Sequence, residues 1–233
     1  MVKILSIGLS IVVLVGAIYF FYVRDDNQAA LNTISERGPV AGVVTIIAFG
    51  DSLTAGYGLP INESYPAQLD AALEAQGIQA KVINAGVSGE TTRGNLERAE
   101  FIRSQNPDIV LLGIGGNDAL RALPVTDTKT NIIQTVETLK SGENPPVVML
   151  LKMQSPLNAG LSYKREFDAM YEEIARSQEI LLVPFLTTEI FLNQENKLSD
   201  GIHLNKVGYG RVVEGYLLKS VVEVIERLED KDT

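Results

Sequence analysis

The chain of 233 residues is 45% hydrophobic, which is enough to build the core of one domain with an appended segment. Its formal net charge of −9 argues against a nucleic-acid partner, because phosphate binding needs a basic surface. The chain has no cysteine, which excludes disulfides, thiolate metal sites, a cysteine nucleophile and a lipid-modified N-terminal cysteine.

The chain opens with an uncharged, almost wholly apolar stretch from Ile4 to Val23. A helix of that length would span roughly 30 Å, the thickness of the hydrocarbon core of a bilayer. We therefore expect residues 1–24 to be a transmembrane helix that anchors the protein, with the rest facing the periplasmic or extracellular side. Two alternatives stay open: a cleaved signal, which would leave a secreted or periplasmic protein, and a buried core helix.

A polar connector is expected over residues 25–42, and a single globular domain over residues 43–233. From residue 43 onward, short apolar runs alternate with stretches of helical periodicity. The expected strands cover residues 43–49, 80–83, 109–112, 147–151 and 180–183, and the expected helices cover residues 65–76, 91–105, 126–140, 162–177 and 206–228. This alternation predicts an α/β fold, a three-layer α/β/α sandwich around a mainly parallel central sheet.

Polar residues follow three of the expected strands, in glycine-rich turns. They are Asp51-Ser52, Ser88-Gly89 and Asn117-Asp118. Each turn alone is common in α/β proteins. Because the carboxyl ends of parallel strands share one edge of a sheet, the three turns together indicate a site.

The only histidine of the chain, His203, lies three residues after Asp200 and just before the last helix. This spacing lets a carboxylate contact one imidazole nitrogen and leaves the other nitrogen free to face a hydroxyl. A serine hydroxyl needs such a base before it can attack at neutral pH. If Ser52 is a nucleophile of this type, His203 is the only histidine available to activate it.

Four sequence blocks occur in order: FGDSLTAGYG, NAGVSGETT, GIGGND and DGIH. With these blocks the chain resembles the GDSL, or SGNH, hydrolase family, and is most similar to its bacterial multifunctional esterases, which act as thioesterases, arylesterases and lysophospholipases. The resemblance runs from about residue 43 to the C-terminal helix and implies a flavodoxin-like sandwich. It also implies a serine esterase that hydrolyses carboxylic esters or thioesters through an acyl-enzyme.

The resemblance assigns a role to each matched residue. It implies a Ser-His-Asp triad of Ser52, His203 and Asp200. It implies an oxyanion hole made of the backbone N–H groups of Ser52 and Gly89 and the side-chain amide of Asn117.

Two features depart from familiar patterns. The chain has no Gly-x-Ser-x-Gly elbow, so it is not expected to be a lipase-type α/β-hydrolase. Leu204 stands where close relatives often carry proline, which leaves the subfamily open. Asp51 and Asp118 are expected to be structural, for a turn and for capping respectively, although a hydrolase built on these paired carboxylates is an alternative.

Four apolar residues in loops at the same edge are candidates for contacts with an acyl chain: Leu120, Leu123, Met153 and Leu157. They could equally cap the core. The expected partners are a small acyl ester or thioester and, through the N-terminal helix, a membrane. One histidine and no cysteine imply no metal and no organic cofactor. A carbohydrate acetyl esterase and a non-catalytic tethered binding module remain as alternative functions.

Overall fold

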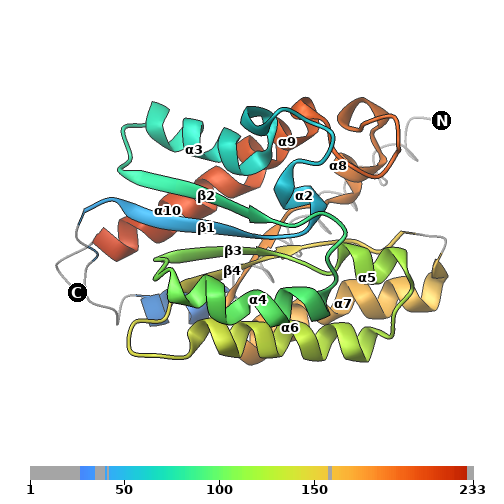
Figure 1. Ribbon diagram of the computed structural model, residues 1–233, viewed down its shortest axis with the longest axis horizontal. Coiled ribbons are helices and arrows are strands. Elements are labelled where there is room, and N and C mark those ends of the chain that lie inside the picture. The colour runs from blue at the N-terminus through green and yellow to red at the C-terminus, as the bar shows by residue number, and fades with distance from the viewer. Residues whose placement is uncertain (1–26, 35–39, 41, 157–158, 230–233) are drawn as a thin grey trace, which may run out of the picture.

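The computed structural model describes residues 27–34, 40, 42–156 and 159–229. A five-stranded sheet lies at the centre, with every strand pair parallel and the spatial order β2-β1-β3-β4-β5 (Figure 1). The strands are β1 (Val44–Gly50), β2 (Ala80–Gly86), β3 (Ile109–Gly113), β4 (Val147–Lys152) and β5 (Leu181–Pro184). This is the doubly wound order of flavodoxin-like folds, in which ligands bind at the carboxyl ends of the strands.

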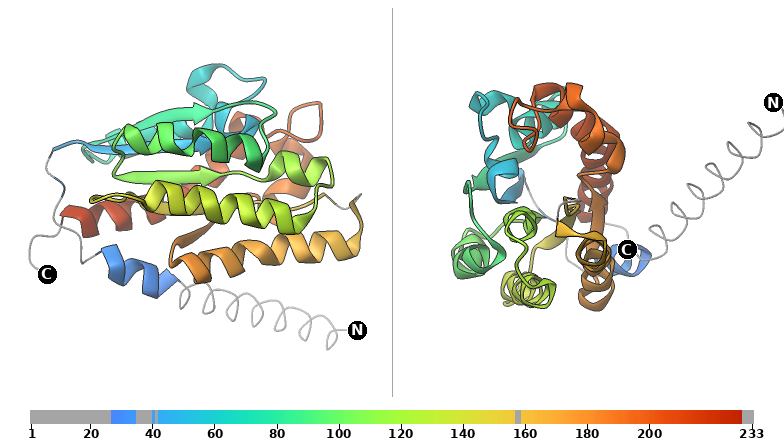
Figure 2. Two further views of the ribbon diagram at one scale, coloured as in Figure 1. Left: turned by 60° about the horizontal axis from the view of Figure 1, so that its bottom comes forward. Right: turned by 90° about the vertical axis from the view of Figure 1, so that its right-hand side faces the viewer.

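Helices cover both faces of the sheet, as expected. One layer consists of α3 (Tyr65–Ala75), α9 (Lys206–Val212) and α10 (Leu218–Glu229). The other layer consists of α4 (Thr92–Ser104), α6 (Val125–Lys140) and α7 (Leu161–Gln178) (Figures 1 and 2). The predicted three-layer arrangement with a parallel sheet is therefore confirmed for the described residues.

The first three strands end level with one another. Gly50 at the end of β1 pairs with Gly86 of β2 and with Gly113 of β3. A Cβ atom at Gly50 would lie 2.1 Å from Thr54 Oγ1, and a Cβ atom at Gly86 would lie 2.2 Å from the backbone nitrogen of Ala55. These positions therefore need glycine because the chain after β1 turns back closely over the ends of the strands. The turn is the short helix α2 (Ser52–Ala55).

Three short helices were not expected from the sequence. They are α2, α5 (Gly116–Leu120) after β3, and α8 (Thr188–Leu192) after β5. The helix expected over residues 206–228 is interrupted by a π-helical turn at Val213–Leu217 (η4). Gly215 lies inside that turn and is the poorest helix former after proline, which is consistent with a local departure from α-helical hydrogen bonding.

Part of the expected connector packs against the domain. Residues 27–34 form a helix whose Ala30, Leu31 and Ile34 are buried in the main core. At its start, Asn27 exchanges two hydrogen bonds with the backbone of Leu182 in the edge strand β5, at 2.9 and 3.2 Å. Three apolar residues at helical spacing among polar ones were too weak a signal to predict this packing.

The expected membrane segment, residues 4–23, lies outside the described residues. Within the part of the chain that the structure describes, no helix combines the length and the hydropathy that crossing a bilayer requires.

Candidate active site

Ser52 lies where β1 ends, as the first residue of α2. Asp51 precedes it as the N-cap, and its Oδ1 accepts a hydrogen bond from the backbone N–H of Leu53 at 3.0 Å. Gly56 ends the short helix in the left-handed conformation, with φ of 76°. The sharp strand-to-helix turn thus presents the Ser52 hydroxyl at the carboxyl edge of the sheet.

His203 connects Ser52 to Asp200. Its Nε2 lies 2.8 Å from Ser52 Oγ, and its Nδ1 lies 2.7 Å from Asp200 Oδ2. The residues expected to form the triad are therefore brought together from segments 151 positions apart. In this arrangement the imidazole can take the serine proton while the carboxylate fixes the tautomer and the orientation of the ring.

The loop that carries His203 holds Asp200 in place through the backbone. Asp200 Oδ1 accepts hydrogen bonds from the N–H groups of Ile202 and His203, at 2.9 and 3.0 Å. Partial burial raises the pKa of the Asp200 carboxyl, but the bonds from His203 and Ile202 outweigh burial and lower it to about 2. Asp200 is consequently ionised at neutral pH and can stabilise an imidazolium.

Tyr57 packs against the ring of His203. The two ring centroids are 4.6 Å apart with an interplanar angle of 36°, and Tyr57 remains half exposed. This contact covers one side of the imidazole and limits its rotation. The sequence placed Tyr57 in the first motif but gave no sign of this contact, because it depends on a residue far away in the chain.

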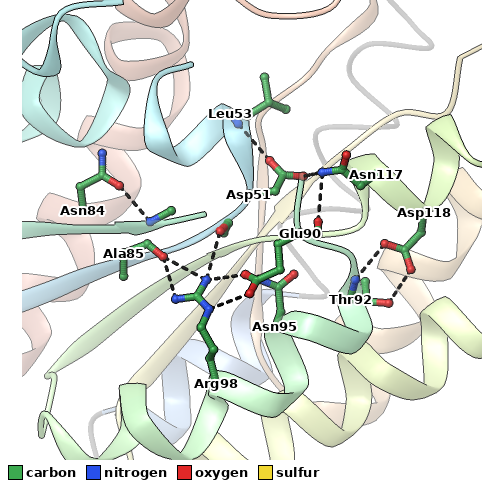
Figure 3. Close-up of polar contacts among 12 residues, drawn as sticks. Asp51, Leu53, Asn84, Ala85, Glu90, Thr92, Asn95, Arg98, Asn117 and Asp118 are labelled. Carbon is green, nitrogen blue, oxygen red and sulfur yellow. Dashed lines mark hydrogen bonds and ion pairs between the residues drawn. The ribbon is translucent and has the colours of Figure 1, made fainter. Parts of the chain in front are cut away.

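The other two strand-end turns place Gly89 and Asn117 at the same edge. Gly89 is exposed and has φ of 81°, a conformation that favours glycine. Asn117 Nδ2 donates to the carbonyl of Glu90 at 3.0 Å and contacts Asp51 Oδ2 at 3.4 Å (Figure 3). Asn117 therefore joins the turn after β1, next to Ser52 in the sequence, to the turn after β2.

Two arginines support the turn that contains Gly89. Arg98 pairs with the carboxylate of Glu90, donates to the carbonyl of Ala85 at 3.2 Å and lies 4.8 Å over the ring of Phe49 (Figure 3). Arg121, just after α5, donates to the carbonyl of Gly89 at 3.0 Å. Arg98 and Arg121 thus hold the carbonyls of Ala85 and Gly89, and no short-range sequence signal predicts these contacts.

The two aspartates beside the site have structural partners. Asp118 accepts from the backbone N–H of Thr92 at 2.9 Å and from its hydroxyl at 2.6 Å, so it caps α4 rather than its own helix (Figure 3). Asp51 holds the turn at Ser52. Neither carboxylate is arranged as one of a catalytic pair, and among the described residues no cluster of histidine and acidic side chains could hold a metal ion.

Burial raises the pKa of Asp51 to about 6, although the hydrogen bond from Leu53, the charge of His203 and the bond from Asn117 all oppose this rise. A carboxyl whose folded pKa exceeds its unfolded value binds protons more tightly in the folded state. The folded state is therefore destabilised progressively as the pH rises from about 4 to about 6, and the cost stays constant above that window.

We predict that Asp51→Asn is more favourable to stability at pH 7.5 than at pH 4. The rise of the pKa from 3.8 to about 6 corresponds to roughly 3 kcal/mol, which sets the upper limit of the difference. Asparagine retains an oxygen that can accept from Leu53. Urea unfolding of both proteins at the two pH values measures the effect, and a stability difference that is the same at both would contradict it.

The four candidate contacts with an acyl chain fall into different environments. Leu120 is about half exposed, and Leu123 is partly buried. Met153 is fully buried in the core, next to Gly113, as the core-capping alternative requires. Leu157 lies outside the described residues. Of the four, Leu120 and Leu123 keep surface available near Asn117.

Comparisons with known proteins identify the family of the chain. Residues 48–211 match the GDSL-like Lipase/Acylhydrolase family. The chain is 35% identical to an arylesterase of Vibrio mimicus over 160 residues, covering 68% of this chain and 78% of the relative. It is 32% identical over 167 residues to the thioesterase 1/protease 1/lysophospholipase L1 of Escherichia coli K12, covering 71% and 78% of the two chains.

A solved structure shows the same fold. The psychrotrophic esterase EstA from Pseudoalteromonas sp., inhibited by monoethylphosphonate, superimposes with a TM-score of 0.73 and 28% identity, covering 78% of this chain and 98% of EstA. The names of these three proteins bear out the expectation of a carboxylic ester hydrolase. The family match covers well over half of the chain and agrees with the four motifs, so the chain belongs to the GDSL-like lipase/acylhydrolase family.

Proposed function

We propose that this enzyme hydrolyses esters or thioesters of acyl chains, with Ser52 as the nucleophile. The observation that carries the proposal is the continuous contact from Ser52 Oγ to His203 Nε2 at 2.8 Å and from His203 Nδ1 to Asp200 at 2.7 Å. No other histidine exists in the chain to serve as the base.

In the proposed reaction, Ser52 Oγ attacks the carbonyl carbon while His203 Nε2 takes the hydroxyl proton. The tetrahedral intermediate collapses, the bond to the alcohol or thiol breaks, and His203 returns its proton to that leaving group. A water molecule then attacks the acyl-serine, again with His203 as base, and the acid is released. The ionised Asp200 stabilises the imidazolium in both steps.

The developing oxyanion is proposed to bind the backbone N–H groups of Ser52 and Gly89 and the side-chain amide of Asn117. The exposed, unbranched Gly89 allows substrate to approach its N–H. Asn117 supplies a neutral donor, and its bond to the Glu90 carbonyl orients the amide before substrate arrives. Arg121 and Arg98 hold the Gly89 turn and are positioning residues.

An acyl chain is the substrate class we favour, because Leu120 and Leu123 leave apolar surface beside Asn117. The named relatives support this class, since they include an arylesterase and a thioesterase/lysophospholipase. Because these relatives carry different names, experiment must determine the length of the acyl chain and the leaving group.

A series of p-nitrophenyl esters from acetate to palmitate tests the substrate class. We expect kcat/KM to rise beyond acetate as apolar surface of the acyl chain is buried, by up to about tenfold for each two buried methylene groups. Strict preference for acetate would contradict the acyl-chain proposal and favour a carbohydrate acetyl esterase. Absence of hydrolysis across the series would favour a non-catalytic binding module.

We further propose that residues 1–24 anchor the enzyme in a membrane and that the hydrolase domain faces the exported side. The support is the uncharged stretch over residues 4–23. Resistance of the membrane-bound protein to extraction with alkaline carbonate is the expected result. Release into the supernatant, or a mature chain that lacks these residues, would contradict the anchor.

A further inference from the structure

Large apolar side chains gather on the loops that surround Ser52 and His203. Six of them are between 39% and 80% exposed, and we call them the apolar collar: Tyr57, Ile61, Val87, Leu120, Leu161 and Ile202. Each belongs to a segment that follows the carboxyl end of a strand, at the end of the sheet that carries α2 and α5 (Figure 1). The collar therefore lies on the face of the molecule that contains the nucleophile.

Contacts between these loops hold their backbones in place relative to one another. Tyr57 packs on His203, the neighbour of Ile202, with centroids 4.6 Å apart. Arg121, the neighbour of Leu120, bonds to Gly89 in the loop of Val87. The Tyr163 hydroxyl, two residues after Leu161, donates to the carbonyl of Leu123 at 2.9 Å. These contacts link the β1 loop to the His203 loop and the β2, β3 and β4 loops to one another, and Asn117 joins the two groups through Asp51 and Glu90.

Exposed apolar side chains that gather in one place mark an interaction surface for a protein or a lipid. The position of the collar around the nucleophile means that whatever covers it also delivers, or blocks, the substrate. A lipid phase would deliver the substrate to Ser52. A permanent protein partner seated there would obstruct Ser52.

The path of the chain favours a lipid surface. Asn27 bonds to Leu182 in β5. From there residues 27–34 run toward the end of the sheet where the strands begin, and the Val40 N–H donates to the Leu228 carbonyl (Figure 2). Residue 27 is therefore the end of this helix that is nearer the collar. The uncharged stretch ends at Val23, four residues earlier, and four residues reach at most about 14 Å. A bilayer that held this stretch would therefore keep the hydrolase domain close to its surface.

We propose that the apolar collar docks on the surface of a lipid bilayer, so that Ser52 faces acyl esters that enter from the lipid phase. The nature of the reacting lipid rests on the function proposed above, whereas the docking itself does not require hydrolysis. With a net charge of −9, the protein gains no general attraction to anionic lipid, so docking is driven by the burial of apolar side chains and is expected on zwitterionic bilayers.

The absence of tryptophan from the chain allows a direct test. A single tryptophan is introduced in the collar, as Ile61→Trp, or on α4 away from it, as Phe101→Trp; the native residues are 80% and 64% exposed. Each full-length variant is reconstituted in phosphatidylcholine vesicles with or without bromine in the acyl chains. We expect brominated lipid to quench the fluorescence of the Ile61→Trp variant and to leave that of Phe101→Trp unchanged. Equal quenching of both variants, or of neither, overturns the proposal.

A second measurement separates docking from the proposed chemistry. We expect Ile61→Ser combined with Leu161→Ser to lower hydrolysis of lysophosphatidylcholine in vesicles by at least about tenfold, since two apolar contacts with lipid are lost, while p-nitrophenyl butyrate in water is hydrolysed at the original rate. Phe101→Ser should change neither rate. Retention of both rates by the double variant overturns docking. If the unaltered protein hydrolyses neither substrate, the proposed function fails while the quenching experiment still decides docking.

Discussion

Replacing Ser52 with alanine will lower kcat for ester hydrolysis by roughly 10⁶-fold, the loss found when the nucleophile of a triad is removed. Alanine keeps the backbone N–H and the helix α2 but has no oxygen to form the acyl-enzyme. His203→Ala should cost a comparable factor because the serine hydroxyl, now 2.8 Å from Nε2, would lose its base. Steady-state hydrolysis of a p-nitrophenyl ester measures both variants.

Two controls make this prediction specific. Ser88→Ala changes an exposed serine in the neighbouring turn and should leave the rate within about threefold, as expected for a surface substitution. The double variant Ser52→Ala/His203→Ala should be no slower than either single variant, because residues that act as a unit are not additive. A double variant that loses the product of the two single factors would show that the residues act independently.

Asn117→Ala is expected to lower kcat by about 10²–10³-fold with little change in KM, which is the usual cost of one oxyanion-hole donor. The effect should fall on kcat because the amide binds the charge that develops in the transition state rather than the neutral carbonyl. The measurement is a full substrate-saturation curve for the variant and the unaltered enzyme.

The same substitution also removes bonds to Glu90 and Asp51, so a structural effect must be distinguished. Asn84→Ala is a matched control, because Asn84 also bonds to backbone at a strand end near the site, at 3.0 Å to the N–H of Gly86 (Figure 3). We expect similar losses of thermal stability for the two variants but a large loss of kcat only for Asn117→Ala. Equal kinetic effects would contradict the donor role.

The strands and the principal helices could be predicted because their signals are local. Apolar runs such as residues 109–112 and the helical periodicity of residues 126–140 carry their own pattern. The short helices α2, α5 and α8 have too few residues to establish a period. The packing of the helix of residues 27–34 could not be predicted, because it depends on contacts with distant residues. The bonds of Asn27 to Leu182 are an example.

The candidate site divides in the same way. Ser52, Gly89, Asn117 and the pair Asp200–His203 could be chosen because each lies in a short motif at a strand end or before a helix. Their supporting partners could not, since the contact between Tyr57 and His203 and the bond from Arg121 to Gly89 join segments that are distant in sequence. Met153 could be placed in the right loop, but whether it faced substrate or core depended on packing.

The raised pKa of Asp51 shows what such packing adds. From the sequence, Asp51 is a turn residue, and its role as the N-cap of α2 agrees with that. Its almost complete burial follows from the way α2 folds back over the ends of the strands. Burial turns a common capping residue into a group whose ionisation costs stability at neutral pH.

The most direct test of the central claim is to locate the covalent adduct formed by an organophosphate ester. Diethyl p-nitrophenyl phosphate should label one residue per chain as activity is lost, and peptide mass spectrometry should place the diethylphosphoryl group on Ser52. Labelling should slow by at least about 10²-fold in His203→Ala, because the base that activates the hydroxyl is gone. An adduct on another residue, or full activity in a protein labelled at Ser52, would contradict the account.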